Sequence, residues 1–335
     1  MTPHLPPDRP GVGDRRRWAP LVLLLALGAA LMALLGRSGP TDSLAPSLAL
    51  PFQLLGTPVH LVDRLASRVV PVGSVEERDL GDTLRRRYDA QVKAQDPSQI
   101  YLDRLMPVLR RHTHRPFPYR AYLIGTCGSA NAMALPGGLI LVCDELLTTL
   151  TSESELLAVL AHEVGHIELS HTFDMVRFQL LAQRTGSASL GELADATIHL
   201  LVQSTYSQAA EHEADDYAFD LLSTSAYDPA GVGLSFASLL RSTEGKGLDG
   251  APRPPDLLGE LARSHPPTTT RLMDYRQRGE AWWSAHPSER RYVGRGNLTQ
   301  RKPLTVMDLP QEWVVGGKGS GRVTGKSGHA GNARR

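Results

Sequence analysis

The sequence predicts an α+β fold, in which a mostly helical domain carries a small β-sheet packed on one central helix. Most segments after residue 74 space their apolar side chains three and four residues apart, which is the period of an amphipathic helix. Three short apolar runs with strand-like character stand close together at 119–124, 131–135 and 139–142. The next long helical segment begins a few residues later, so we expect the sheet to pack against it.

Length and composition predict one large domain with appendages. The 335 residues are 41% hydrophobic, which is enough to bury a substantial core. The 36 basic and 35 acidic residues nearly cancel, and this argues against nucleic acid as a partner, because proteins that bind it usually carry a strong basic excess. We expect a basic and apolar N-terminal segment at 1–36, a linker at 37–73 and the main domain at 74–280. A C-terminal extension at 281–315 and a disordered basic tail at 316–335 follow.

The N-terminal segment is expected to associate with a membrane. Arg15, Arg16 and Arg17 precede an uncharged run at 18–35 that is dominated by leucine and alanine. A helix of this length reaches about 27 Å, close to the roughly 30 Å of a bilayer's hydrocarbon core. We expect a retained anchor that places the rest of the chain on the non-cytoplasmic side. A cleaved signal peptide is the alternative, and it would leave the protein secreted or periplasmic.

Helices are expected on both sides of the strand region. Ser74 followed by Glu77, and Ser152 followed by Glu155, have the spacing of a capping box and predict two helix starts. The helix that begins after Ser152 keeps its apolar spacing through to His171, and it is the central helix of the predicted fold. The same pattern predicts further helices at 98–112, 144–150, 190–222, 257–263 and 267–277.

The chain has two cysteines, Cys127 and Cys143. Two are too few for a disulfide-rich scaffold or for a four-cysteine zinc site. One bridge in an oxidising compartment and two small buried side chains are equally compatible with the sequence.

The central helix contains the segment His162-Glu163-Val164-Gly165-His166, whose spacing is typical of a zinc site. Positions i and i+4 of a helix differ by about 40° of rotation, so both imidazoles project from one face and can reach one ion. Glu163 points beside that face, where it can take a proton from a water molecule instead of binding the metal. Such a string also arises by chance in on the order of a few per cent of chains of this composition. Two ligands alone do not make a site.

A catalytic zinc ion usually has three protein ligands and one open position. His171 lies about 140° around the helix from His166, so it cannot join the same ion without a break. Thr172 stands where the metzincin pattern has its third histidine, which excludes that class. The better candidate is Glu211, with Asp215 one turn later as the acceptor that orients a ligand imidazole. A solvated acidic face is the alternative for these two residues.

Five segments, in this order along the chain, resemble one known family. They are SVEERDLG at 74–81, NAMALPGG at 131–138, AHEVGH at 161–166, EHEAD at 211–215 and SHPPTTTR at 264–271. Together they span roughly residues 74–280 and look like the zinc metallopeptidase family of the CAAX prenyl proteases, which includes HtpX-type membrane proteases and periplasmic BepA-type proteases. A single apolar N-terminal segment is closer to the BepA type than to members with several spans. No C-terminal helical repeats of the kind that the BepA type often carries are visible.

The resemblance implies a zincin-like metallopeptidase domain that holds one Zn²⁺ per chain through His162, His166 and Glu211. It also implies that Glu163 acts as general base and acid. By the same resemblance His265 lies near the metal, where it either stabilises the oxyanion or caps the zinc in a latent state.

Asn131 and its strand would form, by this resemblance, the edge to which an extended substrate adds as another strand. The expected partners are protein or peptide substrates, with the membrane contacted through the N-terminal segment; the sequence predicts no oligomeric state. The expected activity is that of a metalloendopeptidase acting on misfolded or membrane-associated envelope proteins. An envelope chaperone with a latent zinc site is the alternative, but the intact Glu163 argues against it, because a pure binder needs no general base.

Overall fold

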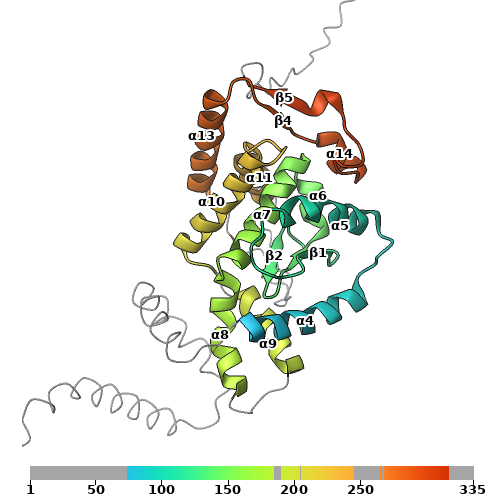
Figure 1. The fold of residues 1–335 in the computed structure, drawn as a ribbon, viewed down its shortest axis with the longest axis vertical. Helices are drawn as coiled ribbons and strands as arrows, with labels where there is room; N and C mark the ends of the chain where they lie inside the picture. The colour runs from blue at the N-terminus through green and yellow to red at the C-terminus, as the bar shows by residue number, and fades with distance from the viewer. Residues whose placement is uncertain (1–73, 185–189, 204, 245–264, 266–267, 317–335) are drawn as a thin grey trace, which may run out of the picture. The chain divides into compact units, whose positions relative to one another are not determined.

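The computed structural model describes residues 74–184, 190–203, 205–244, 265 and 268–316. The apolar N-terminal run, the linker, the predicted helix at 257–263 and nearly all of the basic tail lie outside these residues. Within the described part, no helix combines the length and the apolar character needed to cross a bilayer. The predicted α+β fold, mostly helical with a small sheet, is confirmed for this part of the chain (Figure 1).

A three-stranded sheet confirms the three predicted strands. Strands β1 (Arg120–Leu123), β2 (Ala132–Leu135) and β3 (Leu139–Val142) lie in the order β1-β3-β2. The central strand β3 runs parallel to β1, with Arg120 opposite Leu139, and antiparallel to β2. Strand β2 is therefore an edge of the sheet, as the predicted substrate-binding strand requires.

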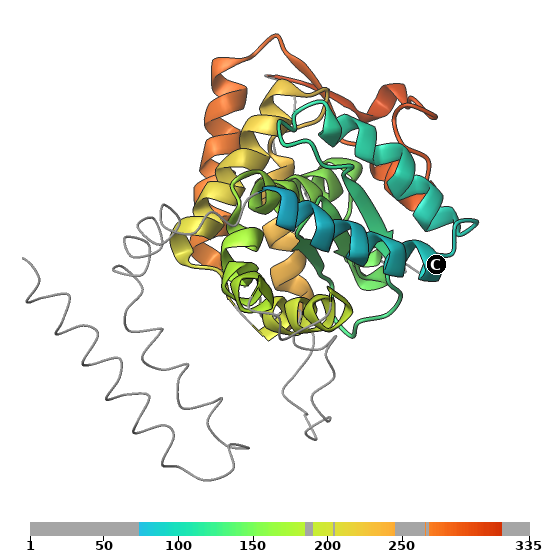
Figure 2. The same cartoon turned by 60° about the horizontal axis from the view of Figure 1, so that its bottom comes forward.

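Helices cover both faces of the sheet (Figures 1 and 2). Because successive strand residues point to opposite faces, Ala134 and Ile140 pack with α5 and α7, whereas Met133 and Leu141 pack with α4, α8 and α9. These helices are α4 (Ser74–Gln91), α5 (Pro97–Arg110), α7 (Glu153–Glu168), α8 (His171–Arg184) and α9 (Leu190–Gln203).

Helix α7 carries the predicted zinc motif, and its start is the predicted one. The Ser152 hydroxyl accepts a hydrogen bond from the backbone amide of Glu155 at 3.3 Å. The end of α7 differs from the prediction, which continued the helix to His171. The helix ends at Glu168, and Ser170 has a φ of +67°, a left-handed conformation that turns the chain into α8.

The single helix predicted at 190–222 is wrong. Helix α9 ends at Gln203, residues 205–207 are not helical, and α10 (Gln208–Thr224) begins after them. The Ser207 hydroxyl accepts the amide hydrogen of Ala210 at 3.2 Å and so caps the new helix. Polar side chains of this kind compete for backbone hydrogen bonds, which favours a break over a continuous helix.

The remaining predicted helices have counterparts. The segment at 144–150 is α6 (Asp144–Thr149), the one at 267–277 is the longer α13 (Thr269–Ala285), and α11 (Gly231–Glu244) was not predicted. The helix start predicted from Ser74 and Glu77 is that of α4, but Glu77 does not serve as its capping residue. Its buried carboxylate pairs instead with Arg115.

Residues 281–315 pack against the start of α7. They contain the end of α13, then β4 (Arg290–Tyr292), α14 (Arg295–Gln300), a 3₁₀ turn (Pro310–Glu312) and β5 (Trp313–Val315), which pairs with β4. The carbonyl oxygens of Val293 and Gly294 accept the amide hydrogens of Ser154 and Glu153 at 3.1 and 3.0 Å. The Glu153 carboxylate in turn accepts the amide hydrogen of Leu304 at 2.9 Å. Amides that a helix start leaves unpaired are thus satisfied by a distant segment.

Cys127 and Cys143 form a disulfide bond, which decides between the two alternatives that the sequence left open. The bridge ties the loop between β1 and β2 to the end of β3. The Glu145 carboxylate holds the same loop, because it accepts the amide hydrogens of Cys127 and Gly128 at 3.0 and 2.8 Å. This loop leads directly into the edge strand β2.

Candidate active site

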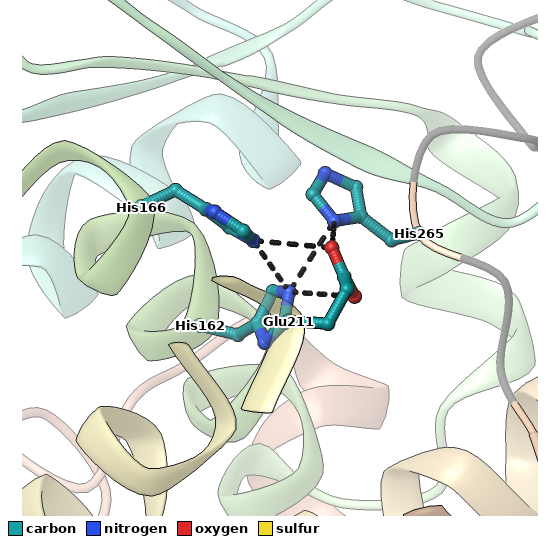
Figure 3. Close-up of side chains that lie close together, drawn as sticks. All are labelled: His162, His166, Glu211 and His265. Carbon is teal, nitrogen blue, oxygen red and sulfur yellow. Dashed lines mark hydrogen bonds and ion pairs between the residues drawn. The ribbon is translucent and has the colours of Figure 1, made fainter. Parts of the chain in front are cut away.

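Four side chains that can bind a metal converge beside the sheet (Figure 3). His162 and His166 project from one face of α7, Glu211 comes from the first turn of α10, and His265 comes from the segment before α13. One donor atom of each lies within 4.8 Å of all the others. The structure thus brings together the three predicted ligands and His265.

The distances within this cluster suit a single ion. The Nε2 atoms of His162 and His166 are 3.0 Å apart, and His166 Nε2 lies 3.4 Å from Glu211 Oε1. His265 Nδ1 lies 3.4 Å from His162 Nε2 and 2.7 Å from Glu211 Oε1. A tetrahedral ion bound at about 2.0–2.1 Å separates its donors by about 3.3 Å. Imidazole nitrogens with one carboxylate are a donor set that divalent transition metals accept.

A close approach between α7 and α10 makes this convergence possible. A Cβ atom on Gly165 would lie 3.2 Å from Ala214 Cα and 3.1 Å from Tyr217 Cβ. The missing side chain therefore lets the two helices approach closely at the level of the cluster. Gly165 thus serves a contact between two helices.

Asp215 lies behind His162, in the place that its spacing from Glu211 predicted. Its Oδ1 is 2.8 Å from His162 Nδ1, the ring nitrogen that faces away from the cluster. Arg271, in the first turn of α13, holds Asp215 with two donors at 2.7 and 2.8 Å. The same guanidinium reaches Glu211 Oε2 at 2.8 Å. One arginine therefore orients the carboxylate in the cluster and the carboxylate behind it.

His171 lies behind His166 and not in the cluster. The turn at Ser170 brings His171 Nδ1 to 3.0 Å from His166 Nδ1, on the outer side of that ring. Its other nitrogen, Nε2, lies 3.0 Å from the Glu213 carboxylate, which is largely exposed and faces away from Glu211. Each α7 histidine in the cluster is thus oriented by a further polar side chain.

Glu163 is buried next to the cluster without belonging to it. Its Oε2 accepts the amide hydrogen of Ala134, in the edge strand β2, at 2.8 Å and lies 3.7 Å from His265 Nε2. Burial raises the pKa of the Glu163 carboxyl above its usual value. A raised pKa makes the Glu163 carboxylate a better proton acceptor.

Asn131 immediately precedes β2 and lines the same cavity as Glu163 and His162. Its Oδ1 accepts the amide hydrogen of Ala132 at 2.9 Å. Its Nδ2 is buried and has no hydrogen-bond partner in the described part of the chain. A buried donor without a partner is costly, so this atom is a candidate contact for a ligand at the strand edge.

Comparison with protein families decides the class of this site. The model of peptidase family M48 matches residues 98–278, which include the metal cluster, Glu163 and the sheet. The chain belongs to peptidase family M48. It is therefore a metallopeptidase, and the resemblance found in the sequence is confirmed.

Characterised relatives of this M48 chain are metalloproteases by name. Metalloprotease LoiP of Escherichia coli (strain K12) is 29% identical over 195 residues, 54% of this chain and 76% of the relative. Metalloprotease YcaL of the same organism is 30% identical over 177 residues, 49% of this chain and 62% of the relative. The beta-barrel assembly-enhancing protease of E. coli is 25% identical over 224 residues, 59% of this chain but only 43% of the relative. The chain thus spans less than two thirds of the last two relatives.

The charges of the M48 site are strongly coupled. Burial alone would raise the pKa of Glu211, but His265, His166 and His162 together hold it well below its usual range. Burial disfavours the charged form of His265, yet the carboxylates of Glu163 and Glu211 outweigh burial and raise its pKa. The Glu211 carboxylate and the His265 imidazole therefore stabilise each other's charged forms.

Tyr206 is a residue of the M48 site that the sequence analysis missed. Its ring stacks on His166, with centroids 4.0 Å apart, and on His265, with centroids 5.0 Å apart. Burial raises its pKa well above the usual value, and the charges of Glu163 and Glu211 act in the same direction. Its position in the break before α10 could not be found while that segment was taken as continuous helix.

Arg271 lies in the late motif of the sequence, but spacing gave it no role. We expect Arg271→Ala to weaken metal binding by about 10–100-fold, because loss of an outer hydrogen-bond partner disorients the ligands it holds. Titration of the metal-free protein with zinc measures this effect. Arg276→Ala, on an exposed face of α13, is the control and should bind zinc normally. Equal affinities in the two variants would exclude this role for Arg271.

Proposed function

We propose that the chain is a zinc metalloendopeptidase in which His162, His166 and Glu211 hold the metal and Glu163 acts as general base and acid. The proposal rests mainly on one observation. Three donor atoms suited to zinc meet beside a buried carboxyl group, that of Glu163, which accepts the amide hydrogen of Ala134 in the edge strand β2. When bound, zinc would activate water and polarise the scissile carbonyl.

The chain's own residues would then perform three tasks. The outer edge of β2 would align an extended peptide through its backbone carbonyl oxygens, because the amides of Ala132 and Ala134 already donate to Asn131 and Glu163. Asn131 Nδ2 would be an additional donor. Glu163, fixed by the amide of Ala134, would take the proton of the attacking water and deliver it to the leaving amine. Asp215 and Arg271 would keep His162 and Glu211 in their binding orientation.

His265 would act in one of two ways that depend on its distance from the metal. Its Nδ1 already lies within the donor cluster, so as a fourth ligand it would fill the position that water needs. Displaced by a short distance, the same ring would donate a hydrogen bond to the oxyanion of the reacting carbonyl. We propose the first arrangement for the resting state and the second for catalysis.

We propose that the substrates are misfolded or membrane-associated proteins of the cell envelope. The arginine-flanked apolar run at 18–35 supports an anchor that leaves the catalytic domain on the non-cytoplasmic side. The Cys127–Cys143 disulfide supports the same location, because such bonds persist in oxidising compartments. Protease added to intact spheroplasts should degrade the domain, and complete protection there would contradict this location.

Metal removal tests the proposed activity. Purified protein should contain one zinc ion per chain and digest unfolded casein, and a chelator should abolish both the zinc content and the digestion. Restoring zinc should restore cleavage. Digestion that persists in protein shown to be free of metal would refute the proposal.

A further inference from the structure

His265 reaches the metal cluster without the support of a helix or strand. It lies in a bend ahead of α13, whereas His162, His166 and Glu211 are carried by the helices α7 and α10. Its Nδ1 lies 2.7 Å from Glu211 Oε1, and its Nε2 lies 3.7 Å from Glu163 Oε2. Side-chain contacts must therefore supply the orientation that a regular backbone supplies to the other three residues.

The contact between His265 and Glu211 cannot fix the imidazole in every state of the site. One ring nitrogen cannot donate a hydrogen bond and bind a metal at the same time. Both atoms of the 2.7 Å contact, His265 Nδ1 and Glu211 Oε1, belong to the donor cluster, so a metal would compete for them. A contact with the face of the ring leaves both nitrogens free, so it can persist with and without metal.

The ring of Tyr206 makes such a contact with His265. The two ring centroids are 5.0 Å apart, and the planes differ by only 27°. The rings of His166 and His162 also lie near His265, but they are inclined to it by 49° and 86°. Among these three neighbours Tyr206 is thus the one that lies nearly flat against the imidazole, as in the offset stacking that aromatic pairs favour.

Tyr206 is itself held in place from two sides. Its ring stacks on His166 at 4.0 Å and 22°, and His166 is buried in α7 and also contacts His171 at 3.0 Å. Tyr206 also directly precedes Ser207, the residue that caps α10. The residue before a helix cap and the fourth residue of the helix lie on the same side, and Glu211 is that fourth residue. The start of α10 therefore places Tyr206 beside the cluster.

We propose that Tyr206 is a positioning residue that extends the fixed orientation of His166 to His265 and so holds the His265 imidazole at the reacting carbonyl. The inference rests on the proposed peptidase function and adds a residue to it. Tyr206 acts through the face of its ring and not through its hydroxyl. The metal ligands do not depend on it, because each has a polar partner of its own behind it.

Two substitutions of Tyr206 separate the ring from the hydroxyl. Tyr206→Ala should lower kcat by about 10-fold, the upper end of what one aromatic contact contributes. KM should not rise, because the positioned imidazole acts on charge that develops in the transition state and not on substrate binding. Tyr206→Phe keeps the ring and should retain normal kcat. Both variants should still contain one zinc ion per chain.

A double-mutant cycle measures whether the effect passes through His265. In protein that already carries His265→Ala, adding Tyr206→Ala should cause no further loss of kcat, because the ring that Tyr206 positions is absent. Equal losses in the two backgrounds would overturn the inference. Loss of zinc from Tyr206→Ala, or a loss of kcat in Tyr206→Phe as large as that in Tyr206→Ala, would overturn it as well.

Trp282→Ala is the matched control for this cycle. Trp282 stacks on His286 with centroids 4.3 Å apart and planes at 18°, but this pair lies at the end of α13 and outside the metal cluster. Removing the same kind of stack there should leave kcat unchanged in both backgrounds.

NMR spectra of the metal-free full chain test the stack without zinc or activity. The ring current of Tyr206 should shift the His265 ring protons upfield, and this shift should disappear in Tyr206→Ala and remain in Tyr206→Phe. Resonances that Tyr206→Ala leaves unchanged would refute the contact even in an active enzyme. Absence of zinc-dependent cleavage in the unmodified protein would instead overturn the proposed function and this role of Tyr206 together.

Discussion

Replacing Glu163 with glutamine should lower peptide cleavage by about 10²–10⁴-fold while zinc stays bound. Glutamine keeps the shape of the side chain, and its carbonyl oxygen can still accept the amide hydrogen of Ala134. It cannot take up a proton from water. The loss should appear in kcat/KM with a cleavable peptide, and zinc content should be measured by mass spectrometry on the same sample.

Glu168→Gln is the matched control for this experiment. Glu168 lies on the same helix, and its carboxylate accepts the amide hydrogens of His114 and Arg115 at 2.8 and 3.2 Å, away from the cluster. Its glutamine variant should retain near-normal turnover. Cleavage by Glu163→Gln at the rate of this control would refute the role of Glu163.

Replacing His162 with alanine should remove zinc and cleavage together. The change deletes one donor and leaves Asp215, whose pKa His162 and Arg271 hold below its usual value despite burial, without its imidazole partner. Affinity for zinc should therefore fall by more than the roughly 10–100-fold expected from the loss of an outer partner. Competition with a chromophoric chelator measures that affinity.

His199→Ala provides the comparison for this loss. His199 is exposed on α9 and lies outside the cluster, so its variant should bind zinc with normal affinity. One zinc ion per chain in His162→Ala would mean that the ion binds elsewhere.

Local spacing was sufficient to predict much of the fold and the core of the site. The three strands and the start of α7 follow from residues close together in sequence, namely apolar runs between turn residues and a serine with its capping partner. Helical rotation alone placed His162 and His166 on one face of α7, and it placed Glu211 and Asp215 together on one face of α10. Such relations need no knowledge of tertiary packing.

The parts that could not be predicted depend on backbone conformation or on distant residues. A left-handed Ser170 turns His171 behind His166, and no periodicity signals such a turn. Arg271 reaches Asp215 from 56 residues further along the chain. The place of His265 was predicted through family resemblance and not from its own surroundings in the sequence. Contacts between distant segments have no local pattern.

The carbonyl oxygens of Val293 and Gly294 accept the amide hydrogens at the start of α7, and this affects how the helix forms during synthesis of the chain. The ribosome makes the motif helix well over a hundred residues before it makes these two. A nascent chain can therefore possess both motif histidines and Glu211 while the helix that presents the histidines still has unpaired amides at its start. The backbone partners that complete the start of α7 in the native structure therefore become available only after Val293 and Gly294 have been translated.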